Sequence, residues 1–191
     1  MELLISAICG LNKGDYSMFY FDDILKKYET EYAYDKALMY LEELYIKKRD
    51  PSTLNSLIGF SWYYFVEGPF ISSKYGKDEG ELPLITWEKY IKIGMNHYAN
   101  DYHFCFISGY TLLLHGFFIK AYQQNYKSIG LELLKSSANT TDTYLKELVD
   151  TIINLEHSKK YAKPEVSITA LNNLFSKNSL LEKYFKDMFS K

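Results

Sequence analysis

The chain has 191 residues, of which 47% are hydrophobic and 24% are charged. This balance is that of a globular protein and excludes a disordered chain. There are 22 basic and 24 acidic residues, a net charge of −2, and Arg49 is the single arginine. Because arginine is preferred for bidentate contacts to phosphate and guanine, a nucleic-acid partner is not expected.

Apolar runs and cysteines indicate the compartment. No run approaches the roughly 18 apolar residues that span a membrane, and the opening residues lack a basic signal-peptide region. Cys9 and Cys105 lie far apart in apolar surroundings, which is typical of buried free thiols. We therefore expect a cytoplasmic protein with no membrane contact.

Helices are expected throughout, because four prolines and ten glycines leave too few turns for an all-β fold. The apolar spacing predicts a first helix over Ser17 to Tyr28. Asp35 is expected to cap a second helix that ends before Asp50-Pro51. A third helix is predicted from Pro51 to about Val66, stopped by Gly68-Pro69.

A long loop is expected next, at about residues 68–85, and loops of that length are often functional. The remaining helices are predicted from their apolar spacing and polar starts. They run from Thr86 to about Tyr98, from a cap at Asp101 to about Asn125, over Ser128–Ser137, from Thr141 or Asp142 to about Lys160, and over Ile168–Phe175 and Leu180–Ser190. The expected fold is one all-α domain over residues 1–191, with eight or nine helices in stacked antiparallel hairpins.

The segment 35–65 resembles the junction between two tetratricopeptide repeats. Ala37, Leu41 and Leu44 match the small and aliphatic positions of a repeat's second helix, followed by the stop at Asp50-Pro51. Ile58-Gly59 and Trp62 match the aliphatic-glycine pair and the aromatic residue of the next helix. The resemblance implies close helical hairpins, in either an irregular bundle or a short repeat-like solenoid.

No catalytic or metal-binding motif is found, so neither a catalytic residue nor a cofactor is predicted. His103 and Cys105 are two positions apart on a helix and point in different directions, which does not favour zinc. His115 lies in an apolar stretch and is interpreted as a core histidine with its hydrogen bonds made. Glycine-rich phosphate loops and nucleophile elbows are also absent from the sequence.

Two features favour binding to a protein. The chain has 19 tyrosines, a residue enriched at interfaces, although many of them have core-facing spacing. Residues 1–35 carry seven acids against three lysines, and an acidic surface attracts a basic partner. The candidate partner-binding residues are Asp22, Asp23, Tyr75, Asp78, Glu79 and Glu81.

In its size, helical build and lysine- and tyrosine-rich composition, the chain resembles immunity proteins of bacterial contact-dependent inhibition. The resemblance implies an inhibitor that binds and neutralises a cognate toxin domain, expected to be basic and of nuclease type. A helical-repeat adaptor that holds a peptide is the first alternative. An enzyme with an unrecognised site is the second, and the oligomeric state is left open.

Overall fold

A computed structural model describes residues 17–75, 81–158, 166–177 and 179–190, with the side chains of 69–75 left out. Within these residues the chain forms nine α-helices, one 3₁₀ helix and no strand, which confirms the all-α fold class. The elements are α1 (Asp23–Thr30), α2 (Tyr34–Lys48), α3 (Pro51–Tyr75), α4 (Glu81–His97), α5 (Tyr102–His115), η1 (Gly116–Phe118), α6 (Tyr126–Ser137), α7 (Thr143–Ser158), α8 (Ile168–Leu174) and α9 (Leu180–Phe189).

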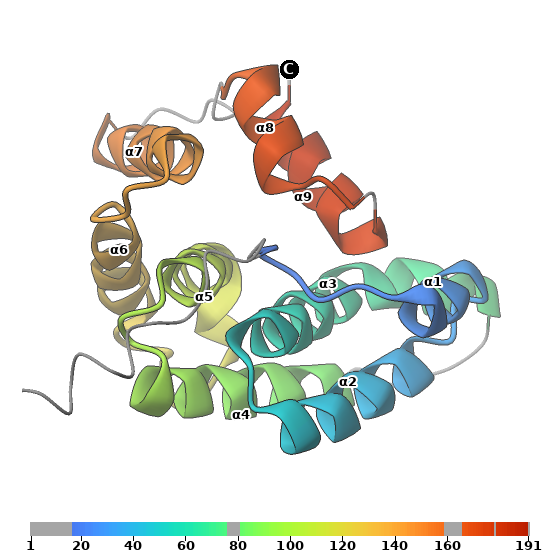
Figure 1. Cartoon of the computed structure of the whole chain (residues 1–191). Helices are drawn as coiled ribbons and strands as arrows, with labels where there is room; N and C mark the ends of the chain where they lie inside the picture. Colours follow the sequence, from blue (N-terminus) through green and yellow to red (C-terminus); the bar gives the residue numbers. More distant parts are fainter. Residues whose placement is uncertain (1–16, 76–80, 159–165, 178, 191) are drawn as a thin grey trace, which may run out of the picture.

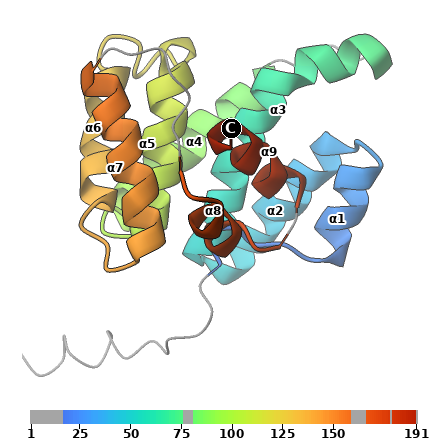
Figure 2. The same cartoon turned by 90° about the horizontal axis from the view of Figure 1, so that it is seen from above.

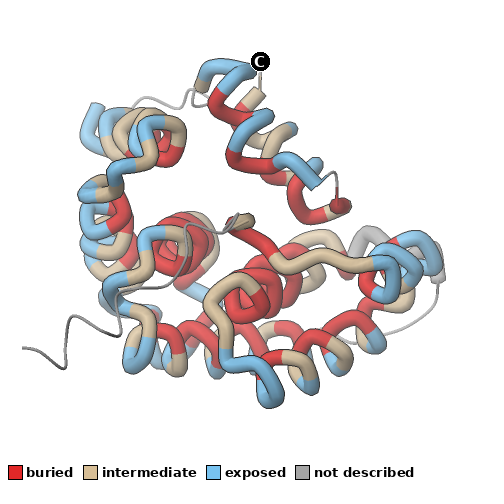
Figure 3. Tube along the Cα trace, viewed as in Figure 1, coloured by how far each residue is buried: buried red, intermediate tan, exposed pale blue. Residues whose placement is uncertain are grey.

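Helix α3 lies at the centre of the arrangement. It packs against α2, α4, α5 and α9, while α5, α6 and α7 follow one another along one flank (Figure 1). Seen from above, α9 lies across α3, and α8 lies beside α9 (Figure 2). Buried residues line the inner sides of these helices, whereas the outward sides of α1, α2 and α4 are exposed (Figure 3).

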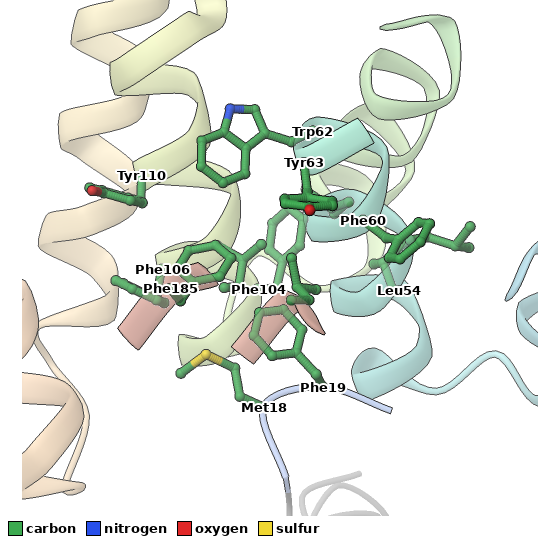
Figure 4. Packing of buried hydrophobic residues seen from close by; sticks show 14 of the residues in the cluster. Met18, Phe19, Leu54, Phe60, Trp62, Tyr63, Phe104, Phe106, Tyr110 and Phe185 are labelled. Atoms are coloured by element: carbon green, nitrogen blue, oxygen red, sulfur yellow. The ribbon is translucent and has the colours of Figure 1, made fainter. Parts of the chain in front are cut away.

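Aromatic side chains form the middle of the core. Phe19, Trp62, Phe106 and Phe185 are all at most 1% exposed and come from four separate segments. The rings of Phe19 and Phe185 are 5.5 Å apart, and those of Trp62 and Phe185 are 5.6 Å apart (Figure 4). The Phe185 ring of α9 therefore connects the segment before α1 with α3 in the middle of the core.

Several helix starts agree with the polar residues that precede them. The Asp101 carboxylate accepts a hydrogen bond from the backbone N–H of Phe104 at 2.7 Å, which confirms the predicted cap of α5. Asp142 accepts from the N–H of Tyr144 at 2.8 Å at the start of α7. Asp50 accepts from the N–H of Thr53 at 2.9 Å, just before the proline that opens α3.

The predicted loop at residues 68–85 is wrong. Helix α3 continues through Gly68-Pro69 to Tyr75, and α4 begins at Glu81, so only residues 76–80 separate the two helices. Thr86 is not a cap but an interior residue of α4, and its hydroxyl donates to the Leu82 carbonyl at 2.8 Å. Pro83 lies in the first turn of α4, where a missing N–H leaves no helical hydrogen bond unmade.

Three other predicted boundaries also differ. The segment before α1 is not helical, because its backbone is held by α3: Asn55 Nδ2 donates to the Met18 carbonyl at 3.1 Å. Asp35 is not a cap, since α2 begins at Tyr34 with no side-chain cap. The helix expected to reach Asn125 ends at His115, where the chain turns back and a Cβ on Gly116 would lie 2.6 Å from that of Tyr126.

The path of α9 distinguishes the two architectures that the sequence left open. In a solenoid each repeat contacts only its neighbours. Here α9 returns to pack on α3, and a Cβ on Gly59 would lie 2.9 Å from a Leu181 methyl group. The glycine permits a close approach of two helices, as predicted, but these helices are far apart in sequence. The architecture is an irregular helical bundle.

Among the helices that the structure describes, none is both long and apolar enough to cross a membrane.

Candidate protein-binding surface

Asp22, the first predicted binding residue, caps α1. One carboxylate oxygen accepts a hydrogen bond from the Leu25 N–H at 2.9 Å, and the other accepts from the hydroxyl of Tyr20 at 2.6 Å and from that of Tyr40. Burial alone would raise the pKa of Asp22, but these hydrogen bonds hold it below its ordinary value. The Asp22 carboxylate therefore links the first turn of α1 to Tyr40 of α2.

The other predicted residues are spread over two helix starts and a part of the chain that the structure does not describe. Asp23 and Glu81 are exposed first residues of α1 and α4. Tyr75 ends α3, but its side chain lies outside the described residues, as do Asp78 and Glu79. Helix α1, the end of α3 and the start of α4 lie at the same end of the molecule (Figure 1).

Tyrosine hydroxyls donate to carboxylates on other helices at several further places. Tyr64 donates to Asp35 at 3.0 Å, Tyr90 donates to Glu42 at 2.7 Å, and Tyr184 donates to Glu67 at 2.8 Å. The acids and tyrosines that suggested partner binding are therefore in part bonded to each other. In this way the chain satisfies the polar tips of large, mostly buried side chains.

Helices α2 and α4 run parallel, side by side. Glu42 contacts Lys89 and Tyr90, while Arg49, farther along α2, accepts from the Tyr98 hydroxyl through its carbonyl. Contacts that advance along both helices in the same direction fix this register. One turn before the Glu42–Lys89 pair, Met39 of α2 and Ile85 of α4 therefore lie at the same level.

Both helices turn large apolar side chains to the outside. Met39 and Ile46 on α2 are 61% and 58% exposed, and Leu82 and Ile85 on α4 are 49% and 60% exposed. Within each helix the two residues lie seven or three positions apart, which places them on one side. We call these four residues the α2–α4 face. Its outer side is exposed in Figure 3.

Charges around the α2–α4 face are mixed: Lys47 and Lys48, which follow Ile46, are exposed as well as the acids. Lys89 is paired with Glu42 and Lys92 with Glu88, each at 2.5 Å. Lys36, Glu43 and Glu81 are exposed and form no ion pair with a residue that the structure describes. Of the predicted binding residues with described side chains, Glu81 adjoins the α2–α4 face, being the residue before Leu82.

The surroundings of His103, His115 and Cys105 are those of residues that contribute to packing. His115 is half-buried, and its Nδ1 accepts a hydrogen bond from Trp62 Nε1 at 3.1 Å. Burial lowers the pKa of His115 and of His103. Cys105 is fully buried and burial raises its pKa to about 12. Cys9 lies outside the described residues. Within the described part of the chain, no three His, Cys, Asp or Glu residues gather as metal ligands.

The α2–α4 face could not be found from sequence reasoning, which assigned residues 70–85 to a loop. The helical register of Leu82 and Ile85, three residues apart, was the available signal. Comparison with known proteins adds no relative: no family model, curated protein or solved structure matches the chain.

Proposed function

We propose that this protein is an immunity-type inhibitor that binds a cognate toxin domain through the α2–α4 face. The observation that carries the proposal is the pair of parallel helices presenting Met39, Ile46, Leu82 and Ile85 to solvent. Exposed apolar residues on neighbouring helices, with charges among and around them, are a common form of protein-binding surface. Among the described residues we identify no reactive group, so we expect the chain to inhibit by binding its target in a fixed ratio.

A basic domain of nuclease type would meet the acidic members of a mixed rim that also contains the exposed Lys36, Lys47 and Lys48. Glu43 and Glu81 adjoin the apolar residues, and Asp23 is exposed at the same end of the molecule. Acids at the rim would speed the encounter with a basic partner, while the apolar centre would supply the affinity. Lys89 and Lys92 oppose this attraction little, because each already pairs with a glutamate.

The test takes the proteins encoded on either side of this chain's own gene and asks whether one of them contains a toxin domain that this chain binds. The two purified proteins are mixed, their stoichiometry is measured by light scattering and their Kd by calorimetry. Toxicity is then scored in cells that express both. We expect a one-to-one complex and rescue of growth. Failure to bind any toxin domain encoded beside the gene would contradict the proposed function.

Surface variants test the position of the interface. Met39→Lys and Ile85→Lys should each weaken binding by about 2 kcal/mol, roughly 30-fold in Kd, because each places a charge at an apolar contact. Ile168→Lys is the matched control, since Ile168 is 74% exposed but lies on α8. Equal binding by all three variants would show that the α2–α4 face is not the interface.

A further inference from the structure

A buried carboxylate joins α1 to the start of α9. Glu29 is 8% exposed, and its Oε2 accepts a hydrogen bond from the backbone N–H of Leu180 at 2.9 Å, across 151 positions of sequence. The N–H groups in the first turn of a helix lack partners within the helix, so an acceptor from another element stabilises that turn. The Oε1 atom of Glu29 has no hydrogen-bond partner among the described residues.

A second buried acid lies in that same first turn. Glu182 is 1% exposed, and its N–H donates to the Ser179 hydroxyl oxygen, the N-cap of α9, at 3.1 Å. Neither carboxylate oxygen of Glu182 has a hydrogen-bond partner of normal geometry in the described part of the chain. Two carboxyl groups are thus held at one helix start, away from water. In the described part of the chain three of their four oxygens lack a hydrogen bond of normal geometry, although the backbone N–H groups of Lys177 and Ser179 favour the charged form of Glu182. An ionised carboxylate is poorly stabilised there.

Few charges compensate this pair. Lys183 of α9 opposes the charge of Glu29, and Lys177 and Lys186 oppose that of Glu182. From α2 and α3, the facing titratable groups are the buried hydroxyls of Tyr34 and Tyr63. No lysine, arginine or histidine of the described residues forms an ion pair with either acid. Protonation of one carboxyl relieves the burial of charge that these contacts leave uncompensated.

We propose that the docking of α9 on α1 and α3 is coupled to proton uptake by the Glu29–Glu182 pair, so that rising pH loosens the C-terminal helix. When α9 is docked, one carboxyl holds a proton taken from solvent. When α9 swings away, both acids become hydrated and the proton is released. The apolar contacts of Leu181 and Phe185 act against release at every pH, and only the carboxyl contribution changes.

The direction of the pH effect on docking follows from the pKa values of the two acids. Burial, with Glu182 nearby, raises the pKa of Glu29 from 4.5 to about 7 in the docked state, although the Leu180 N–H opposes the rise. Burial also raises the pKa of Glu182. The docked state therefore binds more protons than the open state between pH 4.5 and 7. Docking is strongest below pH 4.5 and weakens as the pH rises through 7.

Hydrogen exchange on the whole chain tests the coupling. Amide protection in α9, corrected for intrinsic exchange rates, should fall about tenfold between pH 6 and pH 8, which is the ratio one carboxyl gives for these two pKa values. Protection of α5 and α6 serves as the internal reference. Protection of α9 that stays constant, or that falls equally in α5 and α6, would overturn the proposal.

Two variants assign the effect to Glu29. Glu29→Gln keeps an oxygen to accept from Leu180 and cannot ionise, so α9 should be protected about equally at both pH values. Glu31→Gln is the matched control. Glu31 lies at the end of the same helix, is exposed, and pairs only with Lys27 at 3.9 Å. If Glu29→Gln retained the wild-type pH dependence, Glu29 would not be the coupling group.

Discussion

Adding a single methyl group between α5 and α6 should destabilise the bundle. Gly109 of α5 and Gly130 of α6 face each other so closely that a Cβ added to either residue would contact the backbone of the opposite helix. A Cβ on Gly109 would lie 2.8 Å from the Gly130 carbonyl oxygen and 3.0 Å from the Leu134 nitrogen. Backbone atoms cannot rotate aside, so Gly109→Ala would push the two helices apart.

The size of the effect follows from two opposing contributions. Overpacking of a buried contact typically destabilises by about 1–3 kcal/mol, and contact with rigid backbone places Gly109→Ala at the upper end. Alanine is better than glycine inside a helix by about 0.5–1 kcal/mol. We therefore expect a net loss of about 2 kcal/mol in the free energy of unfolding. For this chain length, that loss is roughly 4–8 °C in Tm.

Urea unfolding followed by circular dichroism measures this loss. Gly130→Ala should behave similarly, since its Cβ would lie 2.9 Å from the Gly109 carbonyl oxygen. The double variant should lose less than the sum of the two, because the first alanine already separates the helices. Gly68→Ala is the control, because its Cβ would meet only the Tyr64 ring, a side chain of its own helix. A Gly109→Ala protein as stable as wild type would refute the steric reasoning.

Three further changes test individual side chains. Asp22→Asn should lower the free energy of unfolding by about 1–2 kcal/mol, as measured in urea. The amide keeps one oxygen to cap α1, but its NH2 group cannot accept from the hydroxyls of Tyr20 and Tyr40. Lowering the pH from 7 to 5 should destabilise wild type relative to His115→Gln, because burial lowers the pKa of His115, whose ring nitrogen accepts from Trp62, whereas the Glu29–Glu182 pair acts in the opposite direction in both proteins. In a Cys9→Ser background, Cys105 should react with a thiol reagent only after unfolding.

Each of these outcomes has a clear opposite. An unchanged urea midpoint for Asp22→Asn would mean that the hydrogen bonds from Tyr20 and Tyr40 to Asp22 contribute nothing to stability. Equal acid sensitivity of His115→Gln and wild type would remove His115 from the pH response. Rapid labelling of Cys105 in the native protein would contradict its burial.

Helix boundaries were predictable where a side chain acts locally and not where packing decides. The cap at Asp101 bonds a backbone group three residues away, so its sequence position is sufficient. Gly68-Pro69 also looked decisive, because proline inside a helix is unfavourable by about 3 kcal/mol. Yet α3 is the helix on which α2, α4, α5 and α9 pack, and it continues to Tyr75. The local preference at Gly68-Pro69 therefore did not decide where α3 ends.

The candidate surface was harder to predict for a related reason. Asp22 and Tyr90 have the composition of an interface, but the fold directs their polar atoms to partners inside the molecule. Met39 and Ile85 were unremarkable apolar residues in the sequence. Their exposure becomes significant only once the Glu42–Lys89 contact sets α2 beside α4. Such relations between helices have no counterpart in the periodicity of either helix alone.

The late position of α9 in the chain has a consequence for biosynthesis. A ribosome completes α1 to α8 before it makes the helix that covers Phe19, Trp62 and Phe106. Until then these rings lack Phe185, their common neighbour, and the growing chain displays apolar surface of the kind that chaperones bind. The protein can therefore reach its native core only after the codon for Phe185 has been translated, which makes its folding sensitive to stalling or truncation before that codon.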